Sequence, residues 1–118
     1  MDLTANDKTR VLQYITEYCQ GIYRARTRTE IAKDTYVLQD YGDKVDSAVR
    51  RVREIISELV QEGHCILSSN EGVYMTDNPD EIERVAKRIL SDAARTREHG
   101  EKLMAMALRI RQKPQMTI

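Results

Sequence analysis

Apolar residues recur every three or four positions along most of this chain, the pattern of helices with one buried face. The first such stretch runs from Asp7 to Cys19. Thr4 or Asn6 can cap its start, and Gly21 is a suitable stop. Its apolar stripe consists of Val11, Leu12, Ile15, Tyr18 and Cys19.

A short second helix is predicted from Arg28 to Asp34. Thr27 and Glu30 have the spacing of a capping box, in which each side chain accepts from the other residue's backbone N–H. Residues 35–43 include aromatic and apolar side chains but show no helical period. We therefore expect a connection there that ends in a turn at residues 40–43.

The third predicted helix runs from Asp43 to Glu62 and has the clearest period in the chain. Gly63 follows and is suited to end it. The predicted inward residues, at spacings of four and three, are Val45, Val49, Val52, Ile56 and Leu59.

The segment from His64 to Thr76 interrupts the helical pattern. Residues 65–67 and 73–75 are rich in β-forming side chains and flank Asn70-Glu71-Gly72, which predicts a hairpin. Because an isolated hairpin is marginally stable in water, we expect its apolar residues to pack on the first and third helices. Residues 21–25 could add a short third strand.

A long final helix is predicted after the hairpin. Asn78 or Asp77 can cap it, and Pro79 suits the first helical position. The pattern continues to about Gln112, and Pro114 is suited to end the helix.

The order helix, short helix, long helix, hairpin, long helix predicts a fold class. It is mostly α with a small β-hairpin wing, a winged helix-turn-helix plus a long C-terminal helix. We assign residues 1–78 to the winged-helix domain and residues 79–118 to a long C-terminal dimerisation helix with a short tail. With 118 residues, the chain is long enough for one modest core.

Residues 44–89 contain a recognisable series of apolar, glycine and serine positions followed by an acidic helix start. Its members are Val52, Arg53, Ile56, Leu59, Gly63, Ile66, Ser68, Gly72 and Tyr74. The series resembles that of the compact winged helix-turn-helix proteins encoded by bacteriophages and prophages. The resemblance covers a little under half of the chain. It implies the winged-helix fold, in a family that includes regulators of transcription or replication.

The net charge of zero hides an uneven distribution. Residues 1–53 carry 10 Lys and Arg against 8 Asp and Glu, residues 54–83 carry none against 8, and residues 84–118 carry 9 against 3. Neutrality alone argues against simple polyanion binding. The segregation nevertheless leaves two regions in which basic surfaces can form on either side of an acidic middle.

Basic side chains at the second and third helices predict binding to double-stranded DNA. A recognition helix presents its N-terminal half to the major groove, where Arg can read guanine. With Val49, Val52 and Ile56 inward, the outward residues of the third helix are Asp43, Lys44, Ser47, Arg50, Arg51, Glu54 and Glu58. The predicted DNA-binding residues are Arg24, Arg26, Arg28, Lys44, Ser47, Arg50 and Arg51. The alternative is a solvated helix face that binds nothing.

The predicted wing tip differs from that of a DNA-binding wing. Residues 68–72 contain no Lys or Arg, and Glu71 would repel phosphate. Ser68, Ser69 and Asn70 could still donate hydrogen bonds to phosphates. We expect a mainly structural wing.

The final helix has a sustained heptad pattern that predicts a homodimer. A helix of up to about 50 Å extends beyond a small domain, so its apolar side beyond residue 93 needs a partner. A second copy of the chain is the preferred partner. The alternative is that the helix folds back after Gly100 as two shorter helices. The predicted dimerisation residues are Ile89, Ala93, Thr96, Gly100, Leu103, Ala107 and Ile110.

No sequence motif points to catalysis, a metal site or a cofactor. His64 and His99 are isolated, and there is no glycine-rich phosphate loop. Cys19 and Cys65 form no ligand motif and are predicted to be small buried apolar residues. No apolar run approaches the ~20 residues of a membrane span, and residues 1–10 lack the apolar stretch of a signal peptide. We expect a cytoplasmic protein that is not an enzyme.

Two functions are compatible with these observations. The first is a dimeric winged-helix DNA-binding protein, a phage or mobile-element regulator of transcription or replication. The second is a winged-helix module that binds other proteins, as in a replication or packaging adaptor or a host-factor inhibitor. The arginines favour the first, whereas the zero net charge and the acidic wing favour the second.

Overall fold

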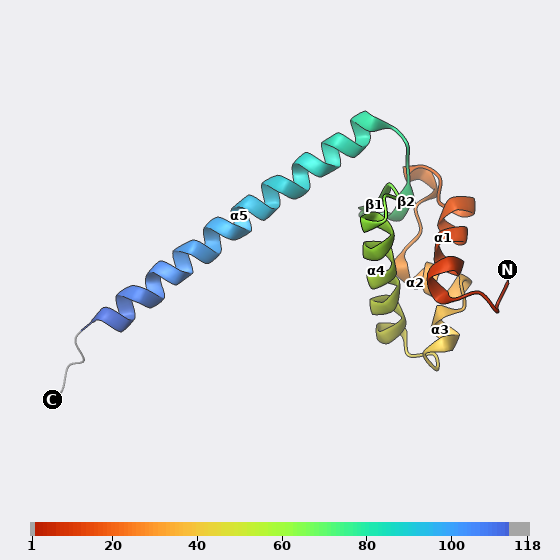
Figure 1. Cartoon of the computed structure of the whole chain (residues 1–118), viewed down its shortest axis with the longest axis horizontal. Coiled ribbons are helices and arrows are strands. Elements are labelled where there is room, and N and C mark those ends of the chain that lie inside the picture. The colour runs from red at the N-terminus through yellow and green to blue at the C-terminus, as the bar shows by residue number, and fades with distance from the viewer. Residues whose placement is uncertain (1, 114–118) are drawn as a thin grey trace. The chain divides into compact units, whose positions relative to one another are not determined.

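The computed structural model describes residues 2–113, which are mostly α with a small two-stranded sheet and a long C-terminal helix (Figure 1), as predicted. The elements are α1 (Asp7–Tyr18), the 3₁₀ helix η1 (Ile22–Arg24), α2 (Arg28–Asp34), α3 (Val37–Asp40), α4 (Val45–Gln61), β1 (Ile66–Ser69), β2 (Gly72–Met75) and α5 (Pro79–Gln112). They fall into two compact units, Met1–Ile82 and Glu83–Ile118. The division lies near the predicted boundary at residue 78, and the predicted stop at Pro114 lies outside the described residues.

Side-chain caps define the starts of three helices. The Asn6 side chain accepts from the N–H three residues later at 2.8 Å and begins α1. Thr27 does the same for α2 at 3.1 Å, and Asn78 accepts from the N–H two residues later at 3.0 Å to begin α5. Each of these bonds satisfies a donor that has no partner within its helix. α4 begins at Val45, two residues later than predicted, and has no side-chain cap.

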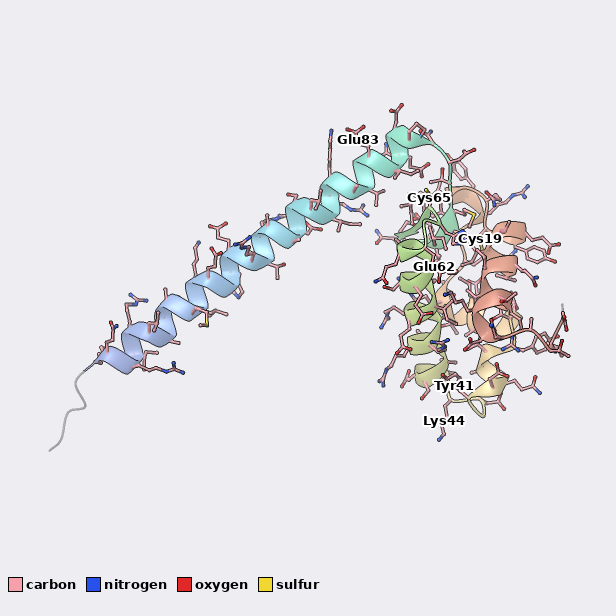
Figure 2. The ribbon with its side chains drawn as sticks, viewed as in Figure 1. Cys19, Tyr41, Lys44, Glu62, Cys65 and Glu83 are labelled. Carbon is pink, nitrogen blue, oxygen red and sulfur yellow. The ribbon has the colours of Figure 1, made fainter. Side chains whose placement is uncertain are left out.

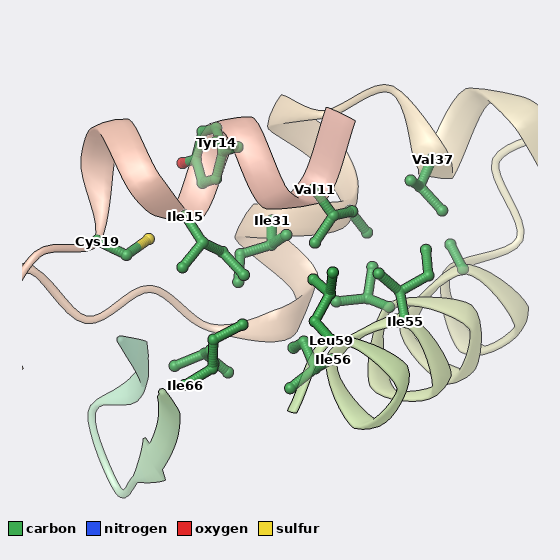
Figure 3. Packing of buried hydrophobic residues seen from close by; sticks show 14 residues of the cluster. Val11, Tyr14, Ile15, Cys19, Ile31, Val37, Ile55, Ile56, Leu59 and Ile66 are labelled. Atoms are coloured by element: carbon green, nitrogen blue, oxygen red, sulfur yellow. The ribbon is translucent and has the colours of Figure 1, made fainter. Parts of the chain in front are cut away.

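The core of the first unit lies between α1, α2, α4 and the hairpin (Figure 3). Burial of each large apolar side chain in it contributes about 1.5–3 kcal/mol. Ile66 and Val73 bring the hairpin into this core, so the predicted packing of the wing on the first and third predicted helices is confirmed. The main members are Val11, Ile15, Cys19, Ile31, Ala32, Val37, Ala48, Val52, Ile55, Ile56, Leu59, Ile66 and Val73.

The inward side of α4 is rotated from the predicted one. Val45 is 46% exposed, whereas Ala48 and Ile55 are completely buried. At 100° per residue, Ala48, Ile55 and Leu59 fall within one narrow arc with Val52, while Val45 lies at the edge of that arc in the first turn. The prediction was therefore wrong at Val45 and omitted two central core residues.

Two further burial predictions were wrong. Tyr18, the last residue of α1, is 45% exposed, and its ring contacts that of Tyr14 with 5.1 Å between the ring centroids. Cys65 is exposed, whereas Cys19 is buried as predicted. Cys65 directly precedes the buried Ile66, and successive residues of an extended chain point in opposite directions.

The hairpin has the predicted strands, but residues 21–25 do not form a third one. β1 and β2 pair antiparallel, with Ile66 opposite Met75 and Ser69 opposite Gly72. Residues 22–24 instead form η1, because Gly21 turns the chain at a φ of 86° and accepts from the N–H three residues later at 3.0 Å. The residues on either side of η1 still pair with β2 through isolated bridges at Gln20 and Arg26.

The segment predicted as an irregular connection contains one helical turn, α3. Val37 of this turn is fully buried and anchors it to the core. Tyr36, directly before it, has a φ of 64°, in the left-handed region that non-glycine residues seldom adopt. Short helices of this kind have too few positions for a period to be detected.

α5 is one continuous helix of 34 residues. It passes through Gly100 without a break, so the predicted alternative of two shorter helices folded back after this glycine was wrong. The predicted continuous helix is confirmed to its end at Gln112.

Candidate nucleic-acid interface

The N-terminal half of α4 carries the predicted base-reading residues around a shallow hollow of about 200 Å³. It is lined by Tyr41, Ser47, Arg50, Arg51 and Glu54. Figure 2 shows Tyr41 and Lys44 at this end of α4 and Glu62 at the other end. Ser47 is half-buried, whereas Lys44 and Arg50 are exposed. The structure therefore brings Ser47, Arg50 and Arg51 together on one surface.

Arg51 differs from its neighbours because its guanidinium is held within the protein. Its Nε donates to Asp7 Oδ2 at 2.7 Å, and its Nη2 donates to Asp7 Oδ1 at 3.0 Å. Glu54 and Glu58 lie 3.6 and 3.8 Å from its Nη1. The hydrogen bonds from Arg51 hold the pKa of Asp7 below its usual value. This arginine joins α4 to the first turn of α1 and has little charge left for an external anion.

Arg50 and Arg53 are the exposed arginines of α4, and neither forms an ion pair with any residue in the described part of the chain. The sequence prediction omitted Arg53 because it centred the inward side of the helix on Val49, Val52 and Ile56, which leaves Arg53 beside that side and not opposite it. The signal was present, since Arg53 follows Arg50 by three residues and both lie opposite the stripe formed by Ala48, Val52 and Ile55.

The three arginines predicted to contact phosphate beside α2 lie in three different environments. Arg24 is exposed in η1. Arg26 faces Tyr14, Tyr18 and Asp34, with Nη1 3.7 Å from Asp34 Oδ2. Arg28 donates from Nη2 to Ser68 Oγ of the wing at 3.2 Å, and its buried Nε has no hydrogen-bond partner among the described residues.

The C-terminal half of α4 is acidic, and its charges are partly compensated by α1. Lys8 pairs with Glu62 and lies 3.8 Å from Glu58. These contacts raise the pKa of Lys8, mainly through the hydrogen bond to Glu62. The 17 residues of α4 thus carry arginines in the N-terminal half and glutamates in the C-terminal half.

The wing tip depends on a close approach of two backbones. A Cβ added to Gly72, which has a φ of 130°, would lie 2.4 Å from both the carbonyl carbon and the oxygen of Arg26. The side chain of Ser69 accepts from the N–H of Glu71 at 3.2 Å and tightens the turn. Only glycine fits at position 72, which explains this residue of the recognised series.

Most side chains on the heptad side of α5 are exposed to solvent along the second unit. Ile89, Leu103 and Ile110 are 58%, 52% and 71% exposed, and Ala107 is half-buried. Ion pairs four residues apart, such as Arg97 with Glu101 at 3.0 Å, lie on other sides of the helix. The remaining predicted seam residues, Ala93, Thr96 and Gly100, are exposed and lie between the larger ones.

Comparison of the chain with protein-family models, with curated proteins and with solved structures gives no match. Among residues 2–113, no group of His, Cys, Asp and Glu side chains is arranged to hold a metal ion. In the same part of the chain, none of the helices combines the length and apolar character needed to cross a membrane.

Proposed function

We propose that this chain is a dimeric winged-helix protein that binds double-stranded DNA through α4, and that it regulates transcription or replication of a phage or mobile element. The observation that carries the proposal is the pair Arg50 and Arg53, three residues apart, exposed on α4 and in no ion pair within the described chain. Arg50 also lines the hollow that contains Ser47. Arg suits bidentate recognition of guanine in the major groove. The phage assignment rests on the resemblance of residues 44–89.

The proposed contact residues differ in part from the predicted ones. We propose that Lys44, Ser47, Arg50 and Arg53, which follow one another every three residues, face the groove, and that Arg28 and Ser68 supply donors at the junction of α2 and the wing. Arg51 instead orients α4 through Asp7 and acts as a positioning residue.

The proposed dimer forms through α5. Each large seam residue left exposed forgoes about 1.5–3 kcal/mol of burial, which a second copy of the helix would recover. Two copies would also present two α4 helices to a two-fold symmetric DNA site.

Anisotropy of a labelled duplex of mixed sequence, titrated at several salt concentrations, tests DNA binding. We expect the logarithm of the association constant to fall linearly with the logarithm of salt, with a slope steeper than about −3. The variant Arg50→Ala/Arg53→Ala should bind more weakly with a shallower slope. Selection from a random DNA pool would then define the site. Absence of binding by the folded wild-type chain at low salt would refute the proposal.

A second candidate function is a module that binds a protein partner. It is favoured by the internal neutralisation of Arg51 by Asp7 and by the wing tip, which has an exposed Glu71 and no cation. If the folded chain does not bind duplex DNA at low salt, that result would support this candidate over the first.

A further inference from the structure

A second hollow lies on the first unit, and it includes Arg26, one of the arginines predicted from the sequence to contact DNA. We call it the tyrosine hollow, and its volume is about 620 Å³. Three of the six tyrosines of the chain line it, and none of its residues belongs to α4. This volume is within the range of about 300–1,000 Å³ that small-molecule sites occupy. Its residues are Tyr14, Tyr18, Arg26, Lys33, Asp34 and Tyr36.

The interior of the tyrosine hollow is fixed by a hydrogen-bonded group. Tyr14 is buried, and its hydroxyl donates to Asp34 Oδ2 at 2.5 Å while accepting from Arg26 Nη1 at 3.2 Å. The Arg26 guanidinium carbon is 5.9 Å from the ring centroids of both Tyr14 and Tyr18. The polar groups at this surface are therefore held in place before any ligand arrives.

Two tyrosine rings and one cation remain accessible at the rim. Tyr18 and Tyr36 are 45% and 43% exposed. Lys33 is exposed and forms no ion pair within residues 2–113. The two positive charges of Arg26 and Lys33 and the one negative charge of Asp34 give the hollow a net charge of +1. The charge favours an anionic ligand, and the exposed tyrosine rings favour one with an aromatic ring.

The backbone at Tyr36 gives an independent indication. Its left-handed conformation, with a φ of 64°, is one that glycine or asparagine adopts with much less strain. A large ring at this position is therefore not explained by the turn between α2 and α3. Strained residues of this kind are concentrated at ligand sites.

We propose that the tyrosine hollow binds a nucleotide unit, with its base against the rings of Tyr18 and Tyr36 and its phosphate at Lys33 and Arg26. Aromatic stacking accepts any base, and the two cations select the phosphate. The unit can be a free nucleotide or part of a single strand of nucleic acid. This site shares no lining residue with the hollow on α4.

Calorimetric titration of the full chain with adenosine monophosphate, with adenosine and with a short 5′-phosphorylated single-stranded oligonucleotide tests the proposal. We expect the phosphate-containing ligands to bind more tightly than adenosine, and Lys33→Gln to remove most of that preference. Equal affinity for the mononucleotide and the oligonucleotide would identify a free nucleotide as the ligand. Tighter binding of the oligonucleotide would identify a single strand.

Two variants separate a ligand role from a structural one. Tyr36→Asn should weaken nucleotide binding about 5- to 100-fold while leaving the thermal midpoint unchanged or higher, because asparagine relieves the backbone strain. Tyr18→Ala should weaken binding similarly, whereas Tyr23→Ala, which removes a fully exposed ring outside the hollow, should have no effect. The proposal is overturned if the wild-type chain binds neither nucleotide ligand, or if Tyr18→Ala and Tyr36→Asn both bind as the wild type does. Arg50→Ala/Arg53→Ala should retain nucleotide binding even if the DNA proposal fails.

Discussion

Arg51 of α4 donates two hydrogen bonds to Asp7 in the first turn of α1. Nε lies 2.7 Å from Oδ2, and Nη2 lies 3.0 Å from Oδ1. Both side chains are about three-quarters removed from solvent. The pair joins residues 44 positions apart and fixes how α4 lies against α1. Two adjacent arginines on one helix consequently have different roles, since Arg50 points to solvent and Arg51 does not.

The two arginines should respond differently to substitution. Arg51→Ala should lower the free energy of unfolding by about 1–2 kcal/mol, because it removes a charge-assisted bidentate pair. Arg50→Ala should leave stability nearly unchanged but cost about 1–3 kcal/mol of affinity for a selected DNA site. Urea denaturation and anisotropy measure the two effects. Equal stability losses, or a DNA defect confined to Arg51→Ala, would contradict these roles.

The stability of the protein should depend on Asp7 at acid pH. Arg51 lowers the pKa of Asp7 below the ordinary 3.8, so the pair contributes stability at pH values above 3.8 and loses it as the pH falls through the folded pKa. Asp7→Asn should be less stable than the wild type near neutral pH by about 1 kcal/mol, and this difference should shrink toward about pH 2. Urea titrations across this pH range measure it.

Asp77→Asn is the matched control for that experiment. Asp77 is exposed and forms no ion pair with the described residues, so its removal should leave the pH dependence of stability unchanged. A difference between Asp7→Asn and wild type that stays constant down to about pH 2 would show that the pair is not linked to protonation of Asp7.

The sequence predicts local structure well in this chain and long-range contacts poorly. Caps at Asn6 and Thr27 need only neighbouring residues, so α1 and α2 begin where predicted. The partner of Arg51 could not be predicted, because Arg51 on α4 and Asp7 on α1 are 44 residues apart and no local period relates them. Arg26 contacts Tyr14, where a phosphate contact was predicted, and this likewise depends on how α1 and β2 pack.

Substitution of Gly72 should be far more damaging than substitution of another glycine with positive φ. Gly72→Ala should cost roughly 2–4 kcal/mol of unfolding free energy, because its Cβ would overlap the backbone of Arg26. Gly63→Ala is the control: its φ is 100°, but nothing lies within 4 Å of the added Cβ, so it should lose only about 1 kcal/mol. Thermal unfolding compares them, and equal losses would argue against the close approach.

Seam residues of α5 should control the oligomeric state. Full-length protein should sediment at twice 13.7 kDa at micromolar concentration, and Leu103→Glu/Ile110→Glu should sediment as the monomer because it places charges at the seam. Ala105→Glu, on the opposite side of the heptad, should remain dimeric. A wild-type chain that is monomeric, or a dimer that survives both seam substitutions, would refute the proposed interface.

The most direct test of the central claim, that the outward side of α4 contacts duplex DNA, is amide NMR of the full chain during titration with a duplex chosen by selection. We predict that the largest chemical-shift changes occur at Lys44, Ser47, Arg50 and Arg53, while Tyr18 and Tyr36 of the tyrosine hollow stay unperturbed. Changes that avoid the N-terminal half of α4, for example changes confined to α5, would contradict the claim.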